Sequence, residues 1–519
     1  MDEKLKICIV LATSAANGQV APEDQALAAM SAELAKRGHE VVVVGTGHRA
    51  GWAAKKSWPV RVRYVFLDLT LWSHLEYPRH SCGSYAVFQW LRNSEPFDLV
   101  IFTEWNATGF YSLVGKHQGL AFGTSRMVIC ASGPTAMRRE ASLDFLTDCD
   151  ILERQFMERR CVEYADILLA STEVIEFMQR ERWHLSRQIQ ISASRGDGAS
   201  PEVFAADWID GLDRAFDQIR DAIADGAASD TPPPSISVCI THFNRPLFLA
   251  QQLESLRKQE IPPIEVLVVD DGSTNDDALT YLKSLDSDFK TIGWKVIYQP
   301  NKYLGAARNT GVRHARGDYV LFLDDDDYAQ PSLVRVFGAV AAKTHADIIT
   351  CGTNLFRSID PPQLDDRPWR LLIFPGAAIA AGALRNVFGP SSALVKKSAF
   401  EVMGGFSEIK GVGSEDWELY ARAVLAGYQL ESIPIPLFWY RIRPGSMARS
   451  TQFGANLRRG LSPFLEVTRP ELRETLLFLH GYYYAHLNKR DGILKTLEKK
   501  ARAMRKQLLG RIIHARRGR

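Results

Sequence analysis

The sequence predicts an α/β protein with two doubly wound, Rossmann-like units and a basic helical extension at the C-terminus. In two separate parts of the chain, short apolar runs typical of strands alternate with amphipathic stretches typical of helices. This alternation indicates a parallel sheet covered by helices. A linker-like run, GAASDTPPPS at 226–235, separates the two parts. With 46% hydrophobic and 24% charged residues, the composition is that of globular domains with sizeable cores.

The first unit, residues 1–205, opens with a strand and then a helix that ends before Gly38, a residue type favoured just beyond a helix C-terminus. The expected strands are 7–12, 40–45, 98–102, 127–131 and 166–170. The expected helices are 24–37, 112–117, 151–164 and 207–224, and a loop is expected at 192–204. The last of these helices belongs to a connecting segment, 206–234, which also contains the Pro-rich linker.

The second unit, residues 235–450, repeats the alternation. The expected strands are 236–240, 265–269, 295–298, 319–323 and 347–351. The expected helices are 247–258, 305–315 and 332–343, and a further helix begins near Gly413. The extension, residues 451–519, is expected to be helical and strongly basic toward its end.

Positive charge is concentrated at the end of the chain. Residues 485–519 contain twelve Lys and Arg against two acidic residues, whereas the whole chain has a net charge of only +3. Apolar residues recur on one helical stripe across 493–513, which fits an interfacial helix on anionic lipid. A helix packed on its own domain or in a coiled-coil dimer fits the same pattern. Nucleic acid is not an expected partner, because aromatic residues are not interleaved with the basic ones.

The seven cysteines follow no disulfide or metal-binding pattern, which is typical of a reducing compartment. The chain enters its first strand without a signal peptide, and no apolar run approaches the ~18 residues that span a bilayer. We therefore expect a cytoplasmic protein with a peripheral contact to the inner face of the membrane through 485–519.

Three expected strands of the second unit end in polar clusters. Residues 241–246 follow the first strand, Asp270 and Asp271 the second, and four consecutive aspartates, 324–327, the third. Ligands of open α/β sheets bind at the carboxyl ends of the strands. Crowded carboxylates repel each other unless a cation neutralises them, and Mg²⁺ or Mn²⁺ prefers oxygen ligands and pairs with phosphates. Taken alone, 324–327 could also be a solvated acidic loop.

Two further segments carry charge that suits a diphosphate site. Arg308 lies one turn into an expected helix whose N-terminus also favours phosphate; the alternative is an ordinary surface arginine. Glu415 and Asp416 open another helix. They either complement the helix dipole or supply a carboxylate as general base for an acceptor hydroxyl.

The motifs THFNRP, VVDDGST, NKYLGAARNTG, LFLDDDDYAQP and SEDWEL resemble, in order and spacing, those of family 2 glycosyltransferases of GT-A fold. The resemblance implies a metal-dependent, inverting, hexosyltransferase-type enzyme that uses a nucleotide-diphosphate-sugar and Mn²⁺ or Mg²⁺. It implies donor binding by Thr241, Phe243, Asp270, Asp271, Arg308, Asp324 and Asp325. It also implies metal binding by Asp324 and Asp326, the outer pair of the DxD motif, and catalysis by Asp416 as base with Glu415 beside it.

The sequence departs from the family pattern at two places. Phe243 replaces a tyrosine in the first loop, which keeps a stacking face and loses a hydroxyl, so the nucleotide base stays open. Relatives often carry a histidine, sometimes near the metal, where this chain has Arg443, which argues against a histidine ligand. The QxxRW motif of processive synthases is absent from the sequence, so we expect a non-processive enzyme.

The first unit resembles the N-terminal, acceptor-side half of family 4 glycosyltransferases of GT-B fold. The resemblance rests on KICIVLATSAANG, AELAKRGHEVVVVG, FDLVIFTEWNATGFYSLVGKHQGLAF and FMERRCVEYADILLAS. The sequence leaves no room for the donor-binding half of that fold, and Ser132 stands where relatives often have a histidine. We therefore expect a non-catalytic unit that binds acceptor glycan or a partner.

The sequence thus predicts a glycosyltransferase that acts on a glycan or a polyprenyl-linked acceptor in the synthesis of cell-envelope polysaccharide. Two alternatives stay open. A sugar nucleotidyltransferase would carry a glycine-rich loop after its first strand, and 241–246 contains no glycine. A non-catalytic glycan-binding scaffold would turn over no donor and would tolerate the substitution Asp416→Asn.

Overall fold

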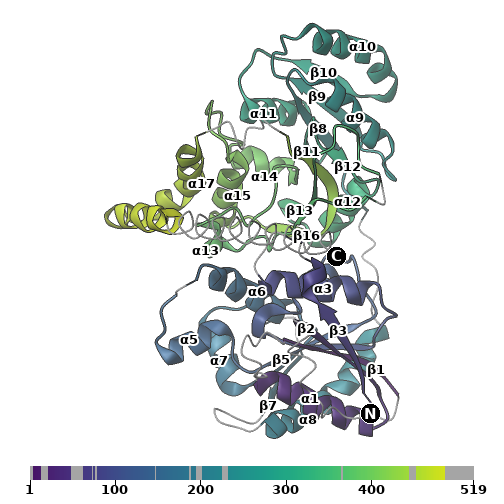
Figure 1. Ribbon diagram of the computed structural model, residues 1–519, viewed down its shortest axis with the longest axis vertical. Coiled ribbons are helices and arrows are strands. Elements are labelled where there is room, and N and C mark those ends of the chain that lie inside the picture. Colours follow the sequence, from purple (N-terminus) through teal and green to yellow (C-terminus); the bar gives the residue numbers. More distant parts are fainter. Residues whose placement is uncertain are drawn as a thin grey trace, which may run out of the picture. The chain divides into compact units, whose positions relative to one another are not determined.

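The computed structural model describes residues 4–12, 22–47, 62–72, 74–75, 79–146, 148–185, 189–193, 201–224, 232–363, 366–443 and 452–485. The chain divides into two compact units, 1–460 and 461–519, and both β-sheets belong to the first (Figure 1). We call residues 4–224 the N-terminal lobe and residues 232–460 the C-terminal lobe. Each lobe is a Rossmann-like α/β unit, which confirms the predicted fold class.

The N-terminal lobe is built on a seven-stranded sheet with the order β3-β2-β1-β4-β5-β6-β7. Its neighbouring strands all run parallel. The strands are β1 (Lys6–Leu11), β2 (Glu40–Gly47), β3 (Arg63–Asp68), β4 (Leu99–Thr103), β5 (Arg126–Ala131), β6 (Ile167–Ser171) and β7 (Ile189–Ala193). The strand order reverses between β1 and β4, which is where doubly wound folds bind ligands.

Two apolar cores lie on the two faces of this sheet. The helices that cover it are α1 (Pro22–Lys36), α3 (Arg79–Arg92), α4 (Phe110–His117), α5 (Thr135–Ser142), α6 (Asp150–Tyr164), α7 (Thr172–Arg180) and α8 (Pro201–Ala224). Because successive strand residues point to opposite faces, Cys8 and Val10 join one core while Ile7 and Ile9 join the other. The second core also contains Trp208 of α8, which lies against α1.

The loop predicted at 192–204 is wrong at both ends. Ser192 and Ala193 complete β7, which pairs with β6 at the sheet edge, and α8 begins at Pro201 rather than at 207. Proline is favoured in the first turn of a helix because that position needs no N–H donor. The proline therefore marked the start of α8 and not the end of a loop.

The C-terminal lobe contains a nine-stranded mixed sheet with the order β10-β9-β8-β11-β15-β13-β16-β12, and β14 pairs with β13. The strands are β8 (Ile236–His242), β9 (Glu265–Asp270), β10 (Lys295–Tyr298), β11 (Tyr319–Asp324), β12 (Tyr328–Ala329), β13 (Ile348–Phe356), β14 (Arg370–Leu372), β15 (Leu394–Lys396) and β16 (Leu430–Arg441). Strands β8 to β11 run parallel, and β15 is antiparallel to both β11 and β13. The order reverses between β8 and β11, so a ligand site is expected at their carboxyl ends.

The helices of this lobe agree with the predicted ones and add several. They are α9 (Pro246–Arg257), α10 (Asp276–Ile292), α11 (Leu304–His314), α12 (Leu333–Thr344), α13 (Ile379–Gly382), α14 (Lys397–Val402), α15 (Glu415–Leu425) and α17 (Phe453–Val467). Helix α11 lies close to β8 because Gly311 has no side chain: a Cβ there would lie 2.1 Å from Sγ of Cys239. This close approach brings the first turn of α11 to the strand ends.

Among the described residues, no helix combines the length and the apolar character needed to cross a bilayer. Residues 470–485 are helical, as expected for the extension. The basic run that begins at Lys489 and the predicted stripe at 493–513 lie outside the described residues.

Candidate active site

The polar clusters predicted at the strand ends do meet at one edge of the sheet. Thr241 on β8 pairs with Val269 of β9 on one side and with Asp324 of β11 on the other. His242 in turn pairs with Asp270. Thr241 is buried, whereas Phe243, just beyond the strand, is 39% exposed. An exposed aromatic face at this edge is available for stacking against a flat ligand.

Asp270 and Asp271 are both buried and organise the loops around this edge. Asp270 accepts a hydrogen bond from the hydroxyl of Ser273 at 2.5 Å. Asp271 accepts hydrogen bonds from the backbone N–H groups of Lys302 and Tyr303, both at 2.8 Å. These bonds fix the loop that leads into α11, where Tyr303 has a left-handed φ of 79°. The two carboxylates therefore shape the loops between β9 and α11.

Arg308 is buried and joins two of the predicted motifs. Its Nη2 lies 2.8 Å from Oδ1 of Asp324, and its Nη1 lies 2.7 Å from Oε1 of Glu415. Burial alone would lower the pKa of Arg308, but these two carboxylates outweigh it and raise the pKa. The guanidinium is thus a permanent positive charge between the end of β11 and the start of α15.

The four aspartates differ sharply in exposure. The side chains of Asp324 and Asp326 are 20% and 12% exposed, whereas the Asp325 side chain is fully buried and Asp327 is buried as a whole residue. The hydroxyl of Ser392 donates to Asp327 at 2.6 Å. Burial and the neighbouring carboxylates raise the pKa of Asp327 well above its usual value. Only the outer pair, Asp324 and Asp326, is therefore open to a ligand.

Asp325 is held by residues that the sequence reasoning did not assign. Nδ1 of His242 lies 2.8 Å from Oδ2 of Asp325, and Nη2 of Arg245 lies 2.9 Å from Oδ1. Burial raises the pKa of Asp325, and both partners act against that rise. The signal was present in the sequence, because THFNRP places two basic residues after a strand that neighbours the aspartate strand.

Asp326 is paired with two arginines. Its Oδ2 lies 3.0 Å from Nη1 of Arg245 and 2.6 Å from Nε of Arg443. Arg443 is the residue that the resemblance places where relatives often have a histidine. At this position a guanidinium therefore contacts Asp326, while the imidazole of His242 contacts Asp325.

The outer aspartates fit a divalent cation by donor type. Both side chains offer carboxylate oxygens, and hard ions such as Mn²⁺ and Mg²⁺ prefer oxygen. The neighbouring Asp327 carboxyl is buried with a raised pKa, and its Oδ1 has no hydrogen-bond partner among the described residues. A cation on Oδ2 of Asp326 would have to displace at least one of the two arginines.

Glu415 and Asp416 form the first turn of α15, as predicted. Glu415 is bound to Arg308, which leaves Asp416 as the carboxylate without an ion-pair partner among the interactions that the structure describes. The backbone N–H of Trp417 donates to Oδ1 of Asp416 at 2.8 Å, and Asn386 lies 3.5 Å from Oδ2. Burial, followed by the charge of Glu415, raises the pKa of Asp416 to about 7. Such a value suits a general base at neutral pH.

The helix that carries Asp416 is firmly supported. Nε1 of Trp417 donates to the carbonyl of Gly382 at 2.8 Å, and Glu418 pairs with Arg459 of α17 at 2.6 Å. Gly460 of α17 packs against the Trp417 ring so closely that a Cβ would lie 2.3 Å from the ring. Contacts from two directions therefore fix the orientation of the candidate base.

Residues 237–403 match the family model described as Glycosyl transferase family 2. This part of the chain is a family 2 glycosyltransferase domain. The matched segment begins in β8 and includes Asp270, Arg308 and Asp324, but it stops before α15 and Asp416.

The family 2 domain is similar to curated proteins over limited lengths. Glycosyltransferase EpsH of Bacillus subtilis is 36% identical over 235 residues, which are 42% of this chain and 64% of that protein. Glycosyltransferase EpsJ of the same organism is 32% identical over 139 residues, 25% of this chain and 39% of that protein. Chondroitin synthase of Escherichia coli is 37% identical over 103 residues, 20% of this chain and 15% of that protein. The chain thus spans less than two thirds of each of these relatives.

Solved structures also resemble the family 2 domain. A crystal structure of Staphylococcus aureus TarS residues 1–349 with UDP-GlcNAc has a TM-score of 0.36 and 19% identity, and covers 47% of this chain and 70% of that one. A mannosyltransferase from Pyrobaculum calidifontis in complex with GDP-Man and Mn²⁺ has a TM-score of 0.33 and 17% identity, and covers 48% and 75%. At TM-scores this low, the likeness supports no transfer of ligand positions.

At the corresponding edge of the N-terminal lobe, the described residues form hydrogen bonds with one another. Glu104, at the end of β4, is buried and accepts hydrogen bonds from the backbone N–H groups of Ser132 and Gly133. Ser132, which the sequence resemblance aligns with a histidine, contacts Glu23 and Arg138 through its hydroxyl. These bonds tie the loop after β5 to the sheet.

Proposed function

We propose that this protein is an inverting, non-processive glycosyltransferase that moves a sugar from a nucleotide-diphosphate-sugar to a hydroxyl of a glycan or lipid-linked acceptor. The observation that carries the proposal is the convergence of Asp324, Arg308 and Glu415 in one chain of ion pairs, with Asp416 next to it. Three separate motifs thereby form one charged cluster at the same sheet edge as the exposed ring of Phe243.

We propose that the donor lies along the strand ends. Phe243 offers a face for the nucleotide base, and Thr241, Asp270 and Asp271 shape the loops around the nucleoside. Both Nη atoms of Arg308 are ion-paired, so its proposed role is to hold Asp324 and Glu415 in place and to set a positive potential near the diphosphate. Asp325 is buried and bound to His242 and Arg245, and we propose that it holds the ends of β8 and β11 together.

We propose that Asp416 is the general base. Its carboxylate removes the proton of the acceptor hydroxyl as the oxygen attacks the anomeric carbon, and the bond from that carbon to the diphosphate oxygen breaks in the same displacement. Attack from the side opposite the leaving group inverts the anomeric configuration. Glu415 stays bound to Arg308 and raises the pKa of its neighbour through its negative charge.

We propose that the enzyme requires Mn²⁺ or Mg²⁺, held by Asp324 and Asp326. When bound by these two carboxylates, a divalent cation would supply positive charge to balance that of the diphosphate leaving group. The exposure of these two carboxylates, set against the burial of Asp325 and Asp327, supports this choice of residues.

The proposed division of the chain assigns catalysis to 235–450 and a non-catalytic, acceptor- or partner-binding role to 1–205, joined by 206–234. Residues 451–519 would include the contact with anionic membrane, through 485–519. A role in surface polysaccharide synthesis is supported by relatives named chondroitin synthase, succinoglycan biosynthesis protein ExoO of Rhizobium meliloti and, in Campylobacter jejuni, a glucosyltransferase named for an undecaprenol-linked glycan.

The deciding experiment is hydrolysis of a panel of UDP-, GDP- and dTDP-sugars with Mn²⁺ or Mg²⁺. We expect metal-dependent release of one nucleotide, lost in Asp326→Ala. A sugar nucleotidyltransferase would instead form a sugar nucleotide from a sugar 1-phosphate and a nucleoside triphosphate. If calorimetry detects no nucleotide binding to the unchanged protein, the scaffold alternative replaces the proposal.

A further inference from the structure

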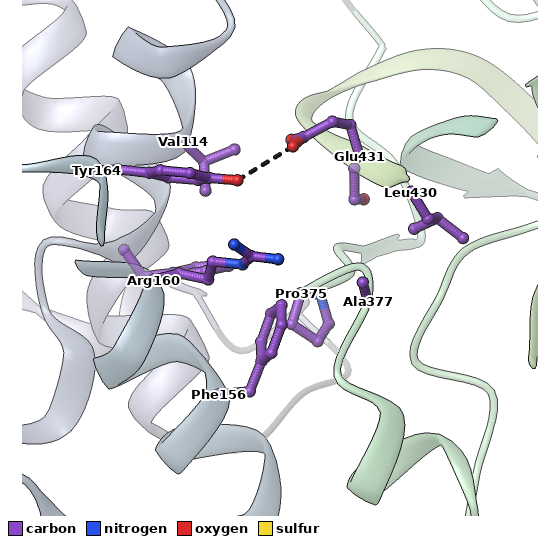
Figure 2. A pocket seen from close by; sticks show the side chains of 10 residues that line it. Val114, Phe156, Arg160, Tyr164, Pro375, Ala377, Leu430 and Glu431 are labelled. Atoms are coloured by element: carbon purple, nitrogen blue, oxygen red, sulfur yellow. Dashed lines mark hydrogen bonds between the residues drawn. The ribbon is translucent and has the colours of Figure 1, made fainter. Parts of the chain in front are cut away.

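The N-terminal lobe holds the C-terminal lobe at three places. Leu371 of β14 lies in the core of the N-terminal lobe, and its N–H donates to the carbonyl of His74 at 3.0 Å. Glu431 of β16 accepts hydrogen bonds from Gln118 at 2.9 Å and from Tyr164 at 3.1 Å. Figure 2 shows the Tyr164 and Glu431 side chains pointing toward each other across a small pocket between the lobes.

The third place is the ion pair between Arg385 and Glu153. Arg385 is the neighbour in sequence of Asn386, which contacts Asp416. Nη2 of Arg385, which follows α13, lies 2.6 Å from Oε2 of Glu153 on α6 and 3.1 Å from Oδ1 of Asp150. The Glu153 side chain is fully buried, and the hydroxyl of Ser81 donates to its other oxygen at 2.9 Å. A buried carboxylate that is already anchored within its own lobe is a rigid partner for Arg385.

The segment that contains Arg385, residues 382–390, contacts α15 at three points. The carbonyl of Gly382 accepts from Nε1 of Trp417, and the carbonyl of Pro390 accepts from the hydroxyl of Tyr420, both at 2.8 Å. Between them, Nδ2 of Asn386 lies 3.5 Å from Oδ2 of Asp416.

Asn386 is itself fixed within this segment. Its Nδ2 donates to the carbonyl of Gly389 at 2.9 Å, and its Oδ1 accepts from the N–H of Phe388 at 3.1 Å. Arg385 and Asn386 are adjacent in the chain, so the position of one limits the position of the other.

We infer that Arg385 is a positioning residue through which the N-terminal lobe orients the catalytic base. Glu153 holds Arg385, the segment 382–390 holds Asn386, and Asn386 faces the Asp416 carboxylate. The N-terminal lobe thus positions the base although it supplies none of the proposed catalytic residues. This inference rests on the proposed role of Asp416.

The test compares Arg385→Met with the unchanged full-length protein. We expect kcat to fall roughly tenfold or more, because small displacements of a catalytic group are costly, with donor affinity by calorimetry unchanged. The acidic limb of the pH–rate profile should shift, because Asn386 no longer sits at its place beside Asp416. Arg385→Lys, which keeps the charge, should recover most of kcat, and Asn386→Ala should reproduce the loss.

A control and a second readout keep the outcomes distinct. Arg180→Met removes an exposed ion pair with Glu140 elsewhere in the N-terminal lobe and should leave kcat unchanged. Hydrogen exchange at the amides of 382–390 and 415–420 should rise in Arg385→Met and not in Arg180→Met. If the unchanged protein turns over no sugar nucleotide, the proposed function is overturned. Faster exchange in Arg385→Met would then still show that Arg385 holds the segment 382–390 and the start of α15 in place. Unchanged exchange, kcat and pH profile in Arg385→Met and Asn386→Ala would overturn the inference.

Discussion

At the scale of residues, the carboxylates of the site differ in partners and exposure, and the proposed roles follow these differences. Asp325 is fully buried between His242 and Arg245, whereas the Asp326 side chain is 12% exposed and pairs with Arg443. Asp416 has a raised pKa and no arginine hydrogen-bonded or ion-paired to it among the interactions described. In the proposed mechanism, chemically identical side chains therefore serve as support, as metal ligand and as base.

The pH dependence of the rate should report the carboxyl group of Asp416. Its pKa is raised to about 7, and only the deprotonated form accepts a proton. We expect kcat/KM to be level above about pH 7 and to fall about tenfold per pH unit below it. Asp416→Asn should lower kcat by roughly a thousandfold and abolish this limb, whereas Asp286→Asn on exposed α10 should change neither. A limb that persists in Asp416→Asn would assign the base to another group.

Arg443 should compete with a metal ion for Asp326. Removing the guanidinium in Arg443→Gln frees Oδ2 from a contact of 2.6 Å, so we expect Mn²⁺ to bind roughly tenfold more tightly in the absence of donor. Mn²⁺ titration followed by electron paramagnetic resonance measures this directly. Arg335→Gln, which removes an exposed arginine paired with Glu260, is the matched control. Equal or weaker Mn²⁺ binding in Arg443→Gln would contradict the competition.

The sequence located the acidic clusters but not their partners. Consecutive aspartates after a strand and the SEDWEL motif are local features, and both lie where they were predicted. The pairing of Arg308 with two carboxylates depends on how α11 packs on β8, and the pairing of His242 with Asp325 depends on the register of β8 and β11. THFNRP does place two basic residues near the aspartate strand, but which carboxylate each of them contacts is set by the fold and not by a local pattern.

At the scale of elements, close packing through glycine sets the geometry of the site. Gly311 lets α11 lie on β8, and Gly460 lets α17 lie against the Trp417 ring of α15. Both helices thereby reach positions that any larger side chain would prevent. Glycine in a helix interior carries an intrinsic cost in stability, and here that cost is offset by the packing it allows.

Gly460→Ala should therefore destabilise the protein although alanine favours helices. A Cβ at this position would lie 2.3 Å from the Trp417 ring, whose Nε1 is already bonded to Gly382. We expect a loss of roughly 1–3 kcal/mol from overpacking. Gly454→Ala in the same helix, where a Cβ meets nothing within 4 Å, should be neutral or stabilising by about 0.5–1 kcal/mol. Denaturant unfolding of the two variants measures the contrast, and equal stabilities would refute it.

Alternation of strand and helix was sufficient to predict most elements of both sheets. Helix α10 was not predicted, although Asn275 caps it through bonds to two backbone N–H groups and Gly293 ends it in a left-handed conformation. Those two residues were the available signal. The short strands β12, β14 and β15 have two or three residues each, too few to produce a periodic pattern.

At the scale of the whole molecule, the two lobes share a core. Leu371 and Ile373 follow β13 in the chain, yet they are buried among the side chains of the N-terminal lobe. The linker between the lobes is therefore not the only element that connects them. A substitution at Leu371 or Ile373, which belong to the C-terminal lobe in sequence, should therefore change the stability of the N-terminal lobe.

Leu371→Ala should weaken the N-terminal lobe. Truncation of a buried leucine costs roughly 2–5 kcal/mol, and here the cavity would open in the core of the N-terminal lobe, where Leu371 forms a backbone bridge with Leu75. Hydrogen exchange of the N-terminal lobe amides should rise. Val402→Ala, at a position 78% exposed, should change stability by no more than about 0.5 kcal/mol. Unchanged exchange in the N-terminal lobe would show that Leu371 adds little to that core.

The shared core has a consequence for synthesis on the ribosome. The strands of the N-terminal lobe are complete by residue 193, but the two apolar side chains that fill the edge of its core emerge only after residue 370. At ~5–20 residues per second, the nascent lobe spends seconds with that edge exposed to water and to chaperones. The core of the N-terminal lobe is thus completed only when Leu371 and Ile373 have been synthesised. We expect a chain that stops between residues 193 and 370 to be prone to aggregate.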